Sequence, residues 1–243
     1  MDSTTPLVFL HAFPLNAAMW EPQRGILGDR PVLTPDFPGF GSRSLDAPDL
    51  ERFAHTVLDH MDAAGIARAV IVGLSMGGYV AFRLHALRPD RVVAMVLADT
   101  KAGSDDEAGR TKRTDQAARV REEGVGWLAE ALLPALLGET TRESRPEVVE
   151  KVKEMAEGAD PEGVARALEA MRERPDSTPG LERIQVPVLV LVGEEDTLTP
   201  EAEARKIAEG VPDGRLVVIP KAGHLSNLEG PEAFNEALLA FLG

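Results

Sequence analysis

The chain contains no cysteine among its 243 residues. This absence excludes a disulfide framework, thiolate metal ligands and a cysteine nucleophile, so a nucleophilic enzyme would have to use an oxygen or an amine. Cations are also scarce, because 26 Lys and Arg residues stand against 40 Asp and Glu residues, for a net charge of -14. Binding to nucleic acid backbones or anionic membranes is therefore disfavoured, since both reward clustered Lys and Arg.

Long hydrophobic runs are missing as well. The first residues read MDSTTPLVFLHAF, an acidic start followed by an apolar run that is too short for a signal sequence or a membrane span. We therefore expect a cytoplasmic protein that acts on a small molecule, with no nucleic acid or membrane partner. The hydrophobic content of 44% is enough to fill the core of one large globular domain. The composition leaves the oligomeric state open.

Six short apolar segments alternate with segments of helical periodicity. Several of them are continuously apolar, which is typical of strands covered by helices on both faces and predicts an α/β fold with a mostly parallel sheet. The predicted strands are 7–10, 31–37, 69–73, 92–99, 186–193 and 215–220. Helices are predicted over 50–65, 76–87, 200–209 and 231–242.

The stretch 101–183 has a different character. It is rich in Arg and Glu, shows no convincing strand, and contains helical patterns broken at glycine and proline. We predict a helical cap inserted into the core. Within it, Leu128, Leu132 and Leu136 recur at helical spacing, so this apolar face either packs on the core or lines a substrate pocket. The predicted organisation is a core of 1–100 and 184–243 with a cap of 101–183.

The most informative local pattern is G-x-S-x-G at Gly73–Gly77, directly after a predicted strand and before a predicted helix. The pattern alone arises by chance in roughly one chain in ten of this length, but the strand–turn–helix context makes it specific. A sharp turn would expose Ser75 at its tip, with glycines removing side-chain clashes. The backbone N–H of Met76 would then face any negative charge that forms nearby. The alternative is an ordinary glycine-rich turn.

A serine hydroxyl becomes a good nucleophile only when a base removes its proton, and the chain offers five histidines. We expect His55 and His60 to lie on a solvated helix surface. His85 points away from the turn, and His11 ends the first strand. His224 follows the last predicted strand, in PKAGHLSN, and parallel strands present their carboxyl ends at one edge. We therefore predict His224 as the base.

The imidazole in turn needs a carboxylate that fixes its tautomer and stabilises its charged form. The segment GEEDTLTP supplies Glu194, Glu195 and Asp196 directly after a strand. We favour Asp196, because it lies furthest beyond the strand end. Asp99, at the end of the neighbouring strand, is the alternative.

A second oxyanion donor is expected from the loop after the first strand, and we predict the backbone N–H of Phe13 for this role, paired with that of Met76. An apolar pocket would favour a small or medium acyl group. The predicted lining residues are Phe13, Met76, Trp127, Leu133 and Leu225.

Over its whole length the chain resembles the α/β-hydrolase family. The similar segments are HAFPLNAAMW, DFPGFGSRS, GLSMGG, GEEDTLTP and AGHLSNLEGP. The order Ser75, Asp196, His224 is also the family's order. Within the family, the chain is most similar to 3-oxoadipate enol-lactonase-like hydrolases and carboxylesterases, including the serine haloperoxidase or perhydrolase type. One departure is Ala12, where the family usually has glycine, and this would be costly if the position required a positive φ.

The resemblance implies a serine hydrolase that cleaves small to medium carboxylic esters or lactones through an acyl-enzyme, without a metal or organic cofactor. The same three residues could also serve an enol-lactonase, a perhydrolase or a C–C bond hydrolase. A non-catalytic ligand-binding protein on this fold is the alternative of a different class. A dianionic lactone would require cationic side chains that point inward from the cap. The candidates are Arg110, Arg113 and Arg121.

Overall fold

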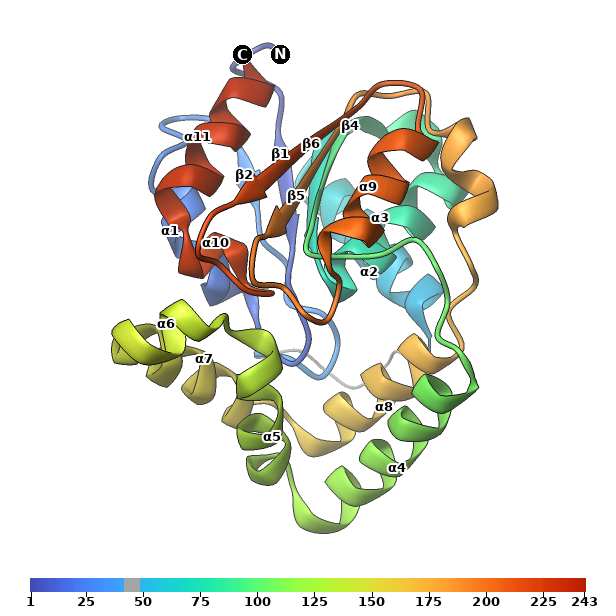
Figure 1. The fold of residues 1–243 in the computed structure, drawn as a ribbon. Helices are drawn as coiled ribbons and strands as arrows, with labels where there is room; N and C mark the ends of the chain where they lie inside the picture. The colour runs from blue at the N-terminus through green and yellow to red at the C-terminus, as the bar shows by residue number, and fades with distance from the viewer. Residues whose placement is uncertain (42–48) are drawn as a thin grey trace.

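A computed structural model describes residues 1–41 and 49–243, so the end of the segment DFPGFGSRS lies outside the described residues. Within this part, six parallel strands form one sheet in the order β2-β1-β3-β4-β5-β6 (Figure 1). The predicted parallel sheet is confirmed, and each predicted strand has a counterpart. The strands are β1 (Leu7–Leu10), β2 (Val32–Leu33), β3 (Ala69–Leu74), β4 (Val92–Ala98), β5 (Val188–Gly193) and β6 (Gly214–Ile219).

Helices cover both faces of the sheet. Because side chains alternate along a strand, β3 sends Ile71 into one apolar core and Val70 and Val72 into the other. The first core is closed by α2 (Leu50–Ala63), α3 (Met76–Leu87) and α9 (Glu201–Gly210). On the second face lie α1 (Glu21–Arg24), α10 (Ser226–Glu229) and α11 (Pro231–Leu242), together with the 3-10 turn Ala17–Trp20 (Figure 1).

The predicted helices match the structure closely, with one shift at the start of α9. The sequence predicts Thr199 as the N-cap and Pro200 as the first helical residue, but Pro200 is the N-cap and the helix begins at Glu201. The reason is that the Thr199 hydroxyl donates to Asp196 at 2.7 Å instead of capping the helix. Thr199 therefore belongs to the candidate active site rather than to the helix.

A helical cap is inserted between β4 and β5 at one end of the sheet (Figure 1). Its longest helix, α4 (Glu107–Glu123), packs along α8 (Pro161–Arg172), where Arg121 donates to Glu162 and Glu169. Pro134 lies inside α5 (Gly126–Leu136) without ending it. The cap helices are α4 (Glu107–Glu123), α5 (Gly126–Leu136), α6 (Glu139–Ser144), α7 (Pro146–Glu157) and α8 (Pro161–Arg172), followed by the 3-10 turn Thr178–Arg183. The boundaries 101 and 183 of the cap remain a prediction.

None of the helices formed by residues 1–41 and 49–243 has the length and apolar character needed to cross a membrane.

Candidate active site

The turn between β3 and α3 places Ser75 in a conformation that favours glycine. Ser75 has φ 54° and ψ -113° and is the N-cap of α3. The glycines around it are required by space: a Cβ on Gly73 would lie 2.4 Å from the carbonyl oxygen of Gly77. A Cβ on Gly77 would lie 2.1 Å from the carbonyl oxygen of Leu10. The chain can therefore turn this sharply only because both flanking positions lack a side chain.

Ser75, His224 and Asp196 lie in one line of hydrogen bonds. Nε2 of His224 lies 2.8 Å from Oγ of Ser75, and Nδ1 lies 2.8 Å from Oδ2 of Asp196. An ionised carboxylate only accepts, so Nδ1 carries the proton and Nε2 is left to accept the proton of the serine. His224 and Asp196 are both buried, which protects the two bonds from water.

The Asp196 carboxylate is fixed by donors from its own loop. Oδ1 accepts from the backbone N–H of Leu198 at 2.8 Å and of Thr199 at 3.0 Å. Burial alone would raise the pKa of Asp196, but the charge and hydrogen bond of His224, with the Thr199 donors, lower the pKa overall. Asp196 is therefore held ionised beside the imidazole.

Asp99, the alternative acid, binds other partners. It has φ 45°, is fully buried, and accepts from the backbone N–H of Gly193 at 2.8 Å and from the hydroxyl of Ser226. Burial, followed by the nearby charge of Asp196, raises the pKa of Asp99 well above its ordinary value. Asp99 joins the end of β5 to the loop that carries His224, and it makes no hydrogen bond with the imidazole.

The predicted oxyanion donors are two backbone N–H groups. In the described part of the chain, the backbone N–H groups of Phe13 and Met76 donate to no other group. Phe13 lines the same cavity as Ser75. Met76 is the first residue of α3, where the helix dipole favours negative charge. Two free donors at this place are suited to an oxyanion.

His11 supports the Phe13 loop, a role that the sequence analysis missed. Its Nδ1 lies 2.9 Å from the carbonyl oxygen of Ala12, and its Nε2 accepts from the backbone N–H of Phe37 at 2.9 Å. Burial lowers the pKa of His11 to about 4, so the ring is neutral at neutral pH. Ala12 is not among the described residues with positive φ, so the missing glycine causes no strain. The position of His11 directly after a buried strand was the available signal.

Ser75 and His224 face a cavity of about 320 Å³ between the core and the cap. Its other walls come from the oxyanion loop, the Asp196 loop, α3, α4, α5 and α8. The side chains that line it are Phe13, Ser75, Tyr79, Lys101, Asp105, Lys112, Arg113, Gln116, Leu132, Leu136, Leu168, Met171, Leu198, Thr199 and His224, with Gly109.

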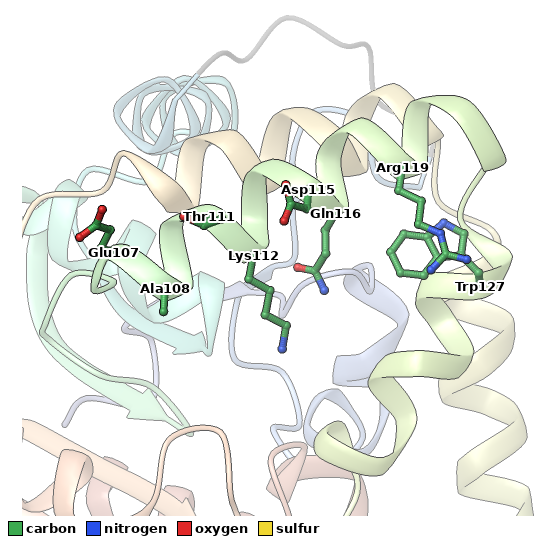
Figure 2. A pocket seen from close by; sticks show the side chains of 8 residues that line it. All are labelled: Glu107, Ala108, Thr111, Lys112, Asp115, Gln116, Arg119 and Trp127. Atoms are coloured by element: carbon green, nitrogen blue, oxygen red, sulfur yellow. The ribbon is translucent and has the colours of Figure 1, made fainter.

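Four of the predicted pocket residues do not line this cavity. The side chain of Met76 is fully buried in the core below it. Leu225 is also fully buried, and Leu133 packs against the core on the far face of the sheet. Trp127 lines a neighbouring cavity beside α4, with the Arg119 guanidinium 4.0 Å from its ring centre (Figure 2). The α5 face that reaches the cavity is that of Leu132 and Leu136.

One of the three candidate arginines reaches the cavity. Arg113 lines it and pairs with Asp105, which also pairs with Arg174 at 2.7 Å and with Lys101 at 3.4 Å. Arg110 and Arg121 instead pair with glutamates of the cap. Lys101 and Lys112 add two cations that the sequence analysis did not single out. Lys112 forms no ion pair with any residue in the described ranges.

The family model described as "Alpha/beta hydrolase family" matches residues 7–237. The chain is a member of this family. One relative, 3-oxoadipate enol-lactonase 2 of Acinetobacter baylyi, is 31% identical over 97% of this chain and 88% of its own length.

Solved structures place this α/β hydrolase beside esterases and lactonases. A thermophilic esterase from Thermogutta terrifontis is similar with a TM-score of 0.95 and 40% identity, over 98% of this chain and 89% of that chain. The enol-lactonase from Burkholderia xenovorans LB400 has a TM-score of 0.91 and 31% identity, over 98% of this chain and 91% of that chain. The fold and the hydrolase family are thus established independently of the site geometry.

Proposed function

We propose that the chain is a serine hydrolase that cleaves small to medium carboxylic esters through an acyl-enzyme. Ser75 attacks the ester carbonyl while His224 takes the hydroxyl proton and then gives it to the leaving alcohol. Water, activated by the same imidazole, hydrolyses the acyl-serine and releases the acid. Asp196 orients His224 and stabilises its charged form throughout.

The negative charge of each tetrahedral intermediate lies on the former carbonyl oxygen. The backbone N–H groups of Phe13 and Met76 receive this charge, because neither donates to a described residue, Phe13 lines the cavity of Ser75, and Met76 directly follows Ser75. One such donor typically contributes on the order of 10²–10³ in turnover. The observation that carries the proposal is the hydrogen-bond line from Asp196 through His224 to Ser75, at 2.8 Å for each imidazole bond.

A panel of p-nitrophenyl esters tests the proposal. Wild type should hydrolyse the acetate, butyrate and octanoate, with the rate falling when the acyl chain outgrows the cavity. Ser75→Ala should lose nearly all of this turnover, about 10⁶-fold in kcat, because the nucleophile is removed. Ser144→Ala is the matched control, since Ser144 is an exposed hydroxyl on the cap helix α6. Full activity of Ser75→Ala would contradict the mechanism.

A second candidate is a lactonase for a substrate that carries a carboxylate. The observation that favours it is the excess of cations at the cavity, because its described lining residues include Lys101, Lys112 and Arg113 but, of the acidic residues, only Asp105. A substrate carboxylate beside Lys112 would gain a charge-assisted hydrogen bond. The named relative 3-oxoadipate enol-lactonase 2 fits this candidate. Its test is the relative rate on matched anionic and neutral esters.

The remaining alternatives give different outcomes in the same panel. Perhydrolase chemistry would require hydrogen peroxide to compete with water for the acyl-serine. A C–C bond hydrolase would be labelled at Ser75 by a fluorophosphonate yet turn over simple esters poorly. A non-catalytic binding protein would give neither labelling nor turnover.

A further inference from the structure

The cavity at Ser75 continues into a larger basin outside it. The basin measures about 790 Å³ and is lined by α4 and by Trp127, at the start of α5. The two cavities share the side chains of Lys112 and Gln116. Figure 2 shows both side chains extending from the same side of α4. Of the inner cavity's lining residues, Lys112 and Leu198 are exposed, so the opening lies between α4 and the Asp196 loop.

The opposite corner of the cap, where α5 meets α6, is fastened to the core. Glu229 accepts from the backbone N–H of Gly138 in the cap at 2.8 Å and from that of Leu225 at 3.0 Å. Glu195 accepts from the backbone N–H of Thr140 at 2.9 Å. Glu195 directly precedes Asp196, and Glu229 binds Leu225, the residue after His224, so this corner of the cap is tied to both loops.

The cap and the core also approach each other very closely at this corner. A Cβ on Gly223 would lie only 2.2 Å from the backbone nitrogen of Gly138, so the loop of His224 and the start of α6 are in direct backbone contact. Arg145 adds a hydrogen bond of 2.7 Å to the carbonyl oxygen of Glu229. On a third side, α8 packs along α4 and closes the back of the cavity with Leu168 and Met171.

We infer that substrates reach Ser75 through the α4–α5 basin, passing Lys112 and Gln116, and not at the α5–α6 corner. The basin then also holds the part of a long substrate that the inner cavity cannot contain. This inference rests on the proposed function, because acylation of Ser75 reports the passage.

The absence of cysteine allows a clean test by single-site labelling. Thr111→Cys places one thiol in the basin, on an exposed position that does not line the inner cavity. The thiol is modified with methyl or with pyrenyl methanethiosulfonate, and the rate of Ser75 labelling by a fluorophosphonate is measured. The pyrenyl adduct should slow labelling at least about tenfold, whereas the methyl adduct should have little effect. Dithiothreitol should remove the adduct and restore the rate.

Glu122→Cys is the matched control, because Glu122 is exposed on the same helix and lines neither cavity. Its pyrenyl adduct should leave the labelling rate unchanged. Equal labelling of Thr111→Cys with and without the pyrenyl group would overturn the inferred route. So would an equal slowing by the methyl group, which would indicate a disturbed helix rather than an obstructed path. Failure of the unmodified variants and wild type to react would instead count against the proposed function.

Discussion

At Ser75 the backbone φ of 54° lies in a region that costs a residue with a side chain about 1–3 kcal/mol. Contacts with the core offset this strain. One of them is the hydrogen bond from the backbone N–H of Ser75 to the carbonyl oxygen of Ala98, at 2.9 Å. The same conformation places the hydroxyl within hydrogen-bond distance of His224. The backbone N–H of Met76, at the start of α3, donates to no described residue.

The role of Asp196 is tested by Asp196→Asn. The amide cannot stabilise an imidazolium, and it can accept from Nδ1 only through its oxygen, so kcat should fall about 10³–10⁴-fold. Glu194→Gln is the matched control from the same loop, since Glu194 is exposed and accepts only from the backbone N–H of Lys221 among described residues. It should keep near wild-type activity with p-nitrophenyl butyrate. Equal losses in the two variants would contradict the assignment of Asp196.

The buried His11 makes stability depend on pH. Its pKa is about 4 in the folded chain against 6.5 for an ordinary histidine, so the unfolded chain takes up the proton first as pH falls. The contribution of the neutral ring to the free energy of unfolding is fully present above pH 6.5. It amounts to about 3 kcal/mol and is lost as the pH falls toward 4.

Urea unfolding of wild type and His11→Gln between pH 7 and 4 measures this contribution. Glutamine stays neutral throughout, so the free-energy advantage of wild type should shrink as the pH is lowered. A difference that stays constant over this range would show that His11 does not titrate as described. The pH-dependent contributions of the other titratable groups cancel in this difference, because wild type and His11→Gln both contain them.

Among the structural elements, the strand–turn–helix unit of β3 and α3 is tightly constrained at its glycines. Gly77→Ala would place a Cβ 2.1 Å from the carbonyl oxygen of Leu10, so β1 and α3 would have to separate. We expect the free energy of unfolding to fall by about 1–3 kcal/mol. Because a displacement of Ser75 by about 1 Å can cost 10²-fold, kcat should fall as well.

Gly180→Ala is the control for this substitution, because nothing lies within 4 Å of the added Cβ. It should leave the urea midpoint and the kcat close to wild type. A stable and fully active Gly77→Ala protein would mean that the turn tolerates a side chain, against the close contact described above.

The parts of the fold that the sequence predicted are those fixed by local pattern. Continuous apolar runs are visible in the sequence because β1, β3, β4 and β5 are almost entirely buried. The glycine-flanked serine is likewise a local pattern. The strand predicted over 31–37 shortens to Val32–Leu33, since Pro35 has no N–H and the N–H of Phe37 donates to His11. The pairing of His11 with Phe37 joins distant segments and leaves no local pattern.

The cavity walls were predicted less well for a related reason. Helical spacing shows that α5 has an apolar face, but its orientation is set by packing against α7 and the core. Leu132 and Leu136 therefore face the cavity, whereas Trp127 lies at the outer basin. Lys101 lies in the β4–α4 connection, and Lys112 and Arg113 lie on α4. Only the folded chain shows that these cations line the same cavity as Ser75.

The whole molecule is strongly acidic, with a net charge of -14, yet the cavity at Ser75 is lined by Lys101, Lys112 and Arg113. If Lys112 binds a substrate carboxylate, Lys112→Gln should lower kcat/KM for mono-p-nitrophenyl succinate about tenfold and leave p-nitrophenyl butyrate nearly unchanged. Added salt should weaken the preference of wild type for the anionic ester, because charges are screened over about 10 Å at 0.1 M.

Lys151→Gln serves as the control, since Lys151 lies on the outer cap helix α7 and pairs with Glu21. Its ratio of the two rates should match wild type. An unchanged ratio in Lys112→Gln would remove the support that the cavity charge lends to the anionic lactone candidate, while leaving the esterase proposal intact.

The central claim is that Ser75 carries the acyl group during turnover. The most direct measurement is an acid quench of the wild-type protein during hydrolysis of p-nitrophenyl butyrate, followed by peptide mass spectrometry. The account predicts one butyryl group on the peptide that contains Ser75, absent in Ser75→Ala. Steady turnover with the acyl group on another residue, or an equal rate in Ser75→Ala, would contradict it.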